Sequence, residues 1–93
     1  MPLNFEWDEK KAKSNLAKHG VSFAEGATVF GDPLSLTIPD PAHSQTEDRF
    51  IIIGSSHRRK LLVVVHTERG ENIRIISARR ASKRERTSHE EST

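Results

Sequence analysis

The sequence contains no cysteine in its 93 residues, which excludes disulfide bonds and thiolate chemistry. This absence fits a reducing compartment, so we expect a cytoplasmic protein. No apolar run approaches the ~20 residues that a membrane-spanning helix needs, and the first residues carry no apolar signal segment. We therefore expect a soluble chain with no membrane association, folded as a single domain over residues 1–93.

Aromatic residues are also scarce, at 5% of the chain and with no tyrosine. An RNA surface built on base stacking needs exposed rings, whereas Trp7 and Phe50 fit positions in a core. The five histidines do not fall at the spacing of metal ligands, and a zinc site without cysteine is not expected. There is no glycine-rich phosphate loop and no nucleophile elbow. The sequence thus predicts no metal site and no cofactor.

Charge, by contrast, is plentiful and unevenly distributed. Residues 1–48 hold four lysines and eight acidic residues, for a net charge of −4. Residues 49–93 hold eleven basic and five acidic residues, for a net charge of +6. A basic half can bind a polyanion, although charges that only keep a small domain soluble would give the same composition. Composition alone leaves both interpretations open.

The N-terminal residues predict a short strand followed by a helix. Apolar and polar side chains alternate over Leu3 to Trp7, as in a strand with one buried face. Asp8 is a typical N-cap residue for a helix over Glu9–His19. Gly20 suits the left-handed position that ends such a helix.

A second helix and two strands should follow. Ser22 and Glu25 form a capping box, which predicts that a helix begins at once. Leu34–Ile38 has a weak strand pattern, and Pro39–Ser44 predicts a loop. A further strand is expected within Glu47–Ser55. Together with the strands that come later, these segments predict an antiparallel meander.

The second half is dominated by a hairpin within residues 61–79. Leu61–Val65 and Ile73–Ile76 are apolar segments rich in β-branched residues, as in strands. The charged residues between them include Gly70, whose backbone freedom suits a chain reversal. Ionisable groups are therefore concentrated at one end of the hairpin, while Arg79 lies at the far end of the second strand.

Two registers of this hairpin would place its ionisable residues differently. A two-residue turn at Arg69 and Gly70 would put His66 on the same face as Arg79, at opposite ends of the strands. A longer turn of the other parity would put His66 beside Arg74 instead. The sequence does not choose between them, because a slip of one residue reverses the faces.

The C-terminal residues predict a short helix. Ser82 and Glu85 form another capping box. The helix would have almost no apolar face, so it should fray or rest on a partner. Residues 88–93 are expected to form a loosely ordered tail.

The hairpin also contains the candidate reactive groups. The imidazole of His66 could serve as a general acid or base near neutral pH, or could be an ordinary hydrogen-bonded residue at a strand end. Glu68 or Glu71 could orient His66 or accept a proton, and Arg69 could bind a phosphate. The alternative is a solvated turn with weak ion pairs.

Five segments together resemble the BrnT family of ribonuclease toxins, which belong to type II toxin–antitoxin systems. They run from residue 5 to about residue 86, and they are FEWDEKKAKSNLAKHGVSF, ATVFGDP, HSQTEDRF, VVVHTERGENIRIISAR and ASKRER. The first of them and IRIISAR are the most distinctive. One departure is that family members often have a tyrosine shortly after the final Glu-Arg pair, whereas this chain has His89.

The resemblance implies an α+β, RelE-like fold: a twisted antiparallel sheet with two N-terminal helices packed on it and a short C-terminal helix. It implies RNA cleavage without a metal, arrest of translation, and neutralisation by a cognate BrnA-like antitoxin. In such families toxin and antitoxin form a hetero-oligomer that binds operator DNA mainly through the antitoxin. Carried onto this sequence, the candidate catalytic residues are His66, Glu68, Arg69, Glu71 and Arg79, and the candidate RNA-binding residues are Arg74, Lys83 and Arg86.

The corresponding mechanistic hypothesis is attack by an RNA 2′-hydroxyl on the adjacent phosphate. His66 or a turn glutamate would take the proton, while Arg79 and a second cation, Arg69 or Arg74, would stabilise the negative charge. DNA would resist cleavage because it lacks this nucleophile. Competing hypotheses are a non-catalytic nucleic-acid-binding module, which would not need His66, and a protein-interaction module that uses the C-terminal helix and an open sheet edge.

Overall fold

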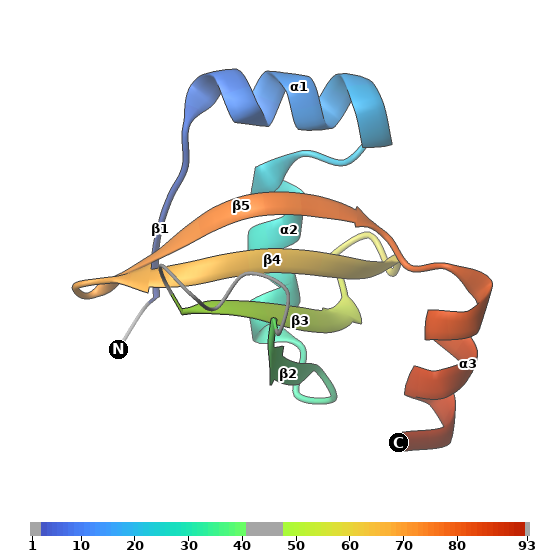
Figure 1. The fold of residues 1–93 in the computed structure, drawn as a ribbon. Coiled ribbons are helices and arrows are strands. Elements are labelled where there is room, and N and C mark those ends of the chain that lie inside the picture. The colour runs from blue at the N-terminus through green and yellow to red at the C-terminus, as the bar shows by residue number, and fades with distance from the viewer. Residues whose placement is uncertain (1–2, 41–47, 93) are drawn as a thin grey trace.

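The computed structural model describes residues 3–40 and 48–92. These residues form a five-stranded sheet, three α-helices and a short 3₁₀ helix (Figure 1). In chain order the elements are β1 (Asn4–Glu6), α1 (Glu9–His19), α2 (Phe23–Thr28), the 3₁₀ helix η1 (Val29–Gly31), β2 (Leu36–Pro39), β3 (Arg49–Ser55), β4 (Leu61–Arg69), β5 (Asn72–Arg80) and α3 (Lys83–Ser92). From residue 41 onward, the loop predicted over Pro39–Ser44 lies outside the described residues.

The strands lie in the order β1-β5-β4-β3-β2. Strands β2 to β5 form the antiparallel meander that the sequence predicted. Strand β1 pairs in parallel with β5, so the prediction of a wholly antiparallel sheet is wrong. Two parallel neighbours need a long connection between them. That connection is most of this chain, and no local sequence pattern reveals the direction in which its ends meet.

The two N-terminal helices begin and end at capping residues. The Asp8 carboxylate accepts hydrogen bonds from the backbone N–H groups of Lys10 at 2.8 Å and Lys11 at 3.1 Å. Gly20 ends α1 with φ of 70°, in the left-handed region that favours glycine. The Ser22 hydroxyl accepts the backbone N–H of Glu25, in the first turn of α2, at 3.0 Å. Local sequence therefore determines where these helices lie along the chain.

Both N-terminal helices pack against β5 on one side of the sheet. We call this side, which carries Leu62, Val64 and Ala78, the helix face, and the opposite side the open face. The buried Asn15 of α1 donates to the Ala78 carbonyl at 2.7 Å and accepts from the Ala78 N–H at 3.1 Å. Gly26 of α2 lets the backbone approach, because a Cβ there would lie 3.2 Å from the Ala78 Cβ. The buried core on this face comprises Val21, Phe23, Val29, Ile52, Leu62, Val64, Ile75 and Ala78.

The C-terminal helix lies apart from this core. Figure 1 shows α3 leaving the end of β5 and running beside the sheet, away from α1. Its first turn is held by a reciprocal capping box: the Ser82 hydroxyl accepts the Glu85 N–H at 3.1 Å, and the Glu85 carboxylate accepts the Ser82 N–H at 2.8 Å. The helix continues to Ser92, through most of residues 88–93, for which the sequence predicted a loosely ordered tail.

Candidate functional site

The central hairpin turns at Gly70 and Glu71, one residue later than the turn that the sequence suggested. Beyond the turn, His66 of β4 pairs with Ile75 of β5, and both side chains are buried. His66 therefore points to the helix face, together with the core.

A register shift between Val65 and His66 then changes which residues share a face. Past the shift, Val63 pairs with Arg79, and the Arg79 side chain lies on the open face. Arg74, which precedes the buried Ile75, also lies on the open face. Neither predicted register is correct, because His66 faces with neither Arg79 nor Arg74. The sequence prediction assigned residues to faces by strict alternation along each strand. A bulge inserts one residue and so reverses this alternation, which the pattern alone does not reveal.

His66 is enclosed by aromatic rings. Its ring centroid lies 4.8 Å from that of Phe30, edge to face, and 5.8 Å from that of Phe50, which stacks on it. Only 5% of the residue is exposed, and its burial lowers the pKa of the imidazole. Within residues 3–40 and 48–92, its Nδ1 atom has no hydrogen-bond partner. His66 is therefore a buried residue of the core, with little of its surface open to a ligand.

The charged turn forms one end of the hairpin. Glu68, Arg69 and Glu71 are all exposed there. A shallow hollow beside them, the turn hollow, is lined by Asp48, Phe50, Thr67, Glu68, Arg69 and Gly70. Its lining includes two carboxylates and one guanidinium, so the hollow does not favour a phosphate electrostatically.

Arg74 is engaged at the sheet edge beside β1. Its guanidinium donates to the Glu6 carboxylate at 2.8 Å, and the side-chain amide of Asn72 donates to the same carboxylate at 3.0 Å. Hydrogen bonds from Asn72 and Arg74 hold the pKa of Glu6 below its ordinary value. This ion pair joins β1 to β5, which gives Arg74 a structural role.

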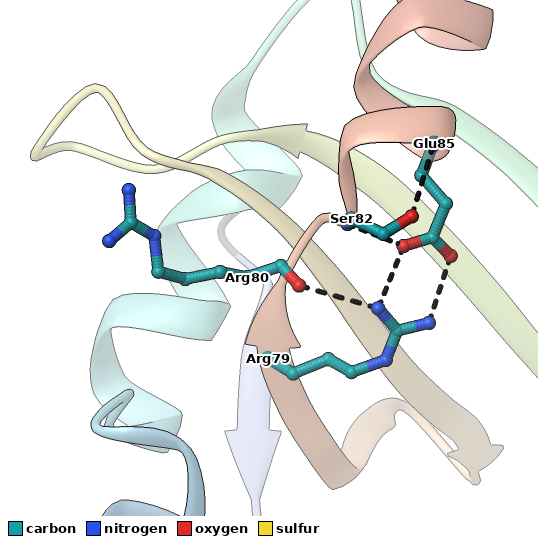
Figure 2. A network of polar contacts seen from close by, with 4 residues as sticks. All are labelled: Arg79, Arg80, Ser82 and Glu85. Carbon is teal, nitrogen blue, oxygen red and sulfur yellow. Dashed lines mark hydrogen bonds and ion pairs between the residues drawn. The ribbon is translucent and has the colours of Figure 1, made fainter.

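Arg79 is likewise paired, with the C-terminal helix. Figure 2 shows its guanidinium donating two hydrogen bonds, each of 2.8 Å, to the two carboxylate oxygens of Glu85. The bond from Arg79 is the main reason why the pKa of Glu85 falls to about 2. The guanidinium of Arg80, the next residue, points away from this pair (Figure 2). Arg79 therefore ties the start of α3 to the open face, and its charge is largely compensated.

A second hollow, the basic hollow, lies where the β3–β4 turn meets the end of β5 and α3. It is lined by Ser55, Arg59, Lys60, Leu61, Arg80, Arg86, His89 and Glu90. Four of these side chains are cationic and one is a carboxylate. Elements distant in sequence thus bring cations together, which is the arrangement that binds a phosphate backbone.

Backbone conformation at the basic hollow is unusual. Arg59 has φ of 62° and is the one non-glycine residue with positive φ in the described part of the chain. Its N–H donates to the Ser56 carbonyl at 2.9 Å, and the Ser56 N–H donates to the Lys60 carbonyl at 2.9 Å, so the turn is tightly held. Strained residues of this kind cluster at functional sites.

His89 of α3 lines the basic hollow and also an apolar groove on the open face. It is partly exposed, and its Nδ1 atom is buried without a partner among the described residues. The imidazole is therefore partly open to a ligand in either hollow. It is the one histidine that the structure places among the cations of this hollow.

Sequence reasoning missed four residues of this hollow, namely Arg59, Lys60, Arg80 and His89. Of the predicted RNA-binding residues, Arg86 lines the basic hollow and Lys83 lies exposed on another side of α3. A signal was available: in an antiparallel hairpin the start of the first strand lies beside the end of the second. Arg-Arg pairs at residues 58–59 and 79–80 must therefore lie at the same end of the sheet.

The residues that the structure describes offer neither a metal site nor a membrane-spanning helix. No group of three or more His, Asp or Glu side chains there could hold a metal ion. No helix there is long and apolar enough to cross a membrane.

These features define a small mixed α/β protein with a basic site suited to a polyanion. Residues 7–85 match the model of the family described as ribonuclease toxin, BrnT, of type II toxin-antitoxin system. The chain is also similar to the ribonuclease toxin BrnT of Brucella abortus, known from a 1.1 Å crystal structure. The identity is 28% and the TM-score 0.69, over 88% of this chain and 100% of that one. Comparison with curated proteins finds no match.

The chain therefore belongs to the BrnT family and is a ribonuclease toxin of the type II class. Membership implies an antitoxin partner. The predicted family and ribonuclease activity are confirmed, as is a mixed fold of a five-stranded sheet and three α-helices.

Proposed function

We propose that this toxin is a metal-independent endoribonuclease that binds RNA in the basic hollow and cleaves it by 2′-hydroxyl attack. The observation that carries the proposal is the convergence of Arg59, Lys60, Arg80 and Arg86 around His89. Such a hollow supplies both the charge that attracts RNA and a group that can accept a proton.

The two hollows at the ends of the hairpin differ in charge, and this difference supports the choice. The turn hollow has more carboxylates than cations in its lining. The basic hollow has an excess of cations, which attracts the backbone and stabilises developing charge on a phosphate. Arg69, Glu68 and Glu71 remain candidates for contacts with more distant nucleotides, and so does Lys83.

In the proposed mechanism, His89 takes the proton from an RNA 2′-hydroxyl. The resulting oxygen attacks the adjacent phosphorus, and the bond from phosphorus to the 5′-oxygen breaks. The leaving oxygen takes a proton from solvent in the open hollow. The products are a 2′,3′-cyclic phosphate and a 5′-hydroxyl. Arg80 and Arg86 stabilise the pentacovalent phosphorane, while Arg79 is a positioning residue that holds α3 through Glu85.

The cellular role follows from this chemistry. Cleavage of RNA would arrest translation in the cytoplasm, and a BrnA-like antitoxin would relieve the arrest. Toxin and antitoxin would assemble into a hetero-oligomer that contacts operator DNA through the antitoxin. We also propose that the sheet is related to that of RelE toxins, with α3 in place beside the RNA.

The proposal is tested with an RNA and its analogue carrying a single 2′-deoxy substitution at the cleavage position, both in excess chelator. We expect cleavage of the RNA, a cyclic phosphate end, and no cleavage at the substituted position. His89→Ala should lower kcat by about 10²–10⁴-fold, the usual contribution of an acid–base group.

His57→Ala is the matched control, because His57 is an exposed histidine that contacts Thr28 of α2 and does not line the basic hollow. It should cleave at the wild-type rate. Cleavage of the deoxy analogue, or an equal loss in both histidine variants, would contradict the proposal.

A further inference from the structure

The open face carries an apolar groove that the cleavage mechanism does not use. Its walls are apolar side chains of three strands, and its end is formed by Arg79 and α3. The apolar residues are Leu36, Ile38, Ile51, Ile53 and Val63, and the remaining residues are Arg79, Glu85, Ser88 and His89. We call this the apolar groove.

One wall of the apolar groove is the edge strand β2. Its apolar side chains are unusually exposed, with Leu36 at 40% and Ile38 at 56%. They lie next to Ile53 and Ile51 of β3, with which they pair. An edge strand and an apolar patch together are features that a soluble protein covers with a partner. Single exposed apolar residues need no explanation, but a contiguous groove does.

The apolar groove and the basic hollow adjoin at His89. His89 lines both, and the neighbours Arg79 and Arg80 line one each. A ligand that lies along the groove and continues past His89 therefore reaches the hollow that is lined by Arg59, Lys60, Arg80 and Arg86. An apolar segment followed by acidic residues is complementary to this combined surface.

We propose that the apolar groove is the docking surface of the antitoxin, whose segment places apolar side chains against β2 and β3 and acidic side chains in the basic hollow. This assignment rests on the proposed function in one respect: occupation of the basic hollow blocks RNA. Neutralisation then needs no conformational change, because one polypeptide covers the cations and His89.

Charge argues against the other occupants of the groove. A second copy of this chain in a two-fold contact would bring two basic hollows toward each other, with like-charge repulsion. RNA binds through its phosphates and has little to gain from a wall of isoleucine and leucine. An acidic, amphipathic polypeptide satisfies both the apolar and the basic parts.

The test compares Ile38→Glu with Leu16→Glu in the full-length toxin. Leu16 is 52% exposed on α1, outside the groove, and so is a matched control for adding a carboxylate. The probe is the purified antitoxin encoded in the same operon, and its Kd is measured by calorimetry alongside RNA cleavage. We expect Ile38→Glu to weaken the antitoxin at least about tenfold, the effect of losing a central anchor, while RNA cleavage is unchanged. Leu16→Glu should change neither.

The proposal is overturned by three outcomes. In the first, Ile38→Glu binds the antitoxin with wild-type affinity and is otherwise unchanged. In the second, Ile38→Glu keeps its affinity for the antitoxin but no longer cleaves RNA. In the third, it keeps that affinity but changes the oligomeric state of the toxin. The last two assign the groove to RNA and to a second copy. If Ile38→Glu fails to fold, Ile38→Thr keeps strand propensity and removes apolar area. Because Kd is measured directly, a wild-type toxin that cleaves no RNA would end the proposed function while leaving this test decisive.

Discussion

His66 and His89 are two histidines with the same apparent defect and opposite surroundings. Each has a buried Nδ1 atom without a hydrogen-bond partner among the described residues. His66 lies on the helix face between Phe30 and Phe50, with 5% of its surface exposed. His89 lies at the other side of the sheet, on α3, where it lines both the apolar groove and the basic hollow.

The difference in surroundings follows from the face of the sheet on which each histidine lies, and not from the residue type. Sequence favoured His66 because it follows an apolar strand and precedes a charged turn. The bulge beside it sends Arg79 to the open face, while His66 stays with the core. In the sequence His89 is notable only as a departure from a family pattern, yet the fold places it beside arginine side chains.

The largest effect should come from reversing charge at one end of the hairpin and not at the other. Arg80→Glu should lower kcat/KM for RNA by about 10²–10³-fold, because it removes a cation from the reacting phosphate and adds a repulsive charge. Arg69→Glu makes the same change at the turn hollow and should cost less than about tenfold, through long-range attraction alone. Steady-state cleavage at two salt concentrations measures both.

Equal losses in the two variants would remove the distinction between the ends. A larger loss in Arg69→Glu would move the reaction to the turn, where Glu68 and Glu71 would become the candidate bases. Each variant should keep the wild-type unfolding midpoint, because both side chains are exposed, whereas Arg74 joins β5 to β1 through its ion pair with Glu6.

The accuracy of the sequence predictions follows the range of the interactions involved. The bounds of α1 follow from Asp8 and Gly20, which act within a few residues, and the structure reproduces them. The meander follows from alternating apolar runs and short turns. The parallel pairing of β1 with β5 and the bulge next to His66 depend on packing between distant segments, and these were missed.

The candidate site was predictable in composition but not in position. The basic second half predicted cations around residues 79–86, and Arg86 lines the basic hollow. Arg79, the predicted stabilising cation, is instead held by Glu85 in a bond that a capping-box pattern does not reveal. Which cations remain available depends on such pairings, and these form only in three dimensions.

The next largest effect concerns stability. His66→Ala should lower the free energy of unfolding by about 2–3 kcal/mol, because it leaves a cavity between two rings. His66→Phe should cost less, since it fills the space and removes the unpartnered nitrogen. Urea denaturation measures both, and RNA cleavage below the midpoint should be unaffected in either. Lost cleavage in folded His66→Phe would restore His66 to the active site.

The pH dependence of stability is a second way to distinguish the buried His66 from His89. Burial lowers the pKa of His66 below its value in the unfolded chain, so the unfolded state binds the proton first as pH falls. The stability due to this group is complete above the unfolded pKa, about 6.5, and is lost as pH falls through the folded pKa. His66→Phe should therefore reduce the fall in the free energy of unfolding below about pH 6.5. His89→Ala should leave the part of that fall due to His66 unchanged.

The smallest expected effect tests whether the strain at the basic hollow is retained for function. Arg59→Gly relieves a positive φ and should stabilise the protein by up to about 1 kcal/mol, less the extra entropy that glycine gives the unfolded chain. Arg58→Gly is the matched control, because Arg58 does not have positive φ, and it should be destabilising. Arg59→Gly should nevertheless weaken RNA binding and reduce its salt dependence, since it removes one cation from the basic hollow. If Arg59→Gly gains stability and loses RNA affinity, Arg59 is retained for its charge. If it gains stability and keeps its RNA affinity, the positive φ of Arg59 is unrelated to RNA binding.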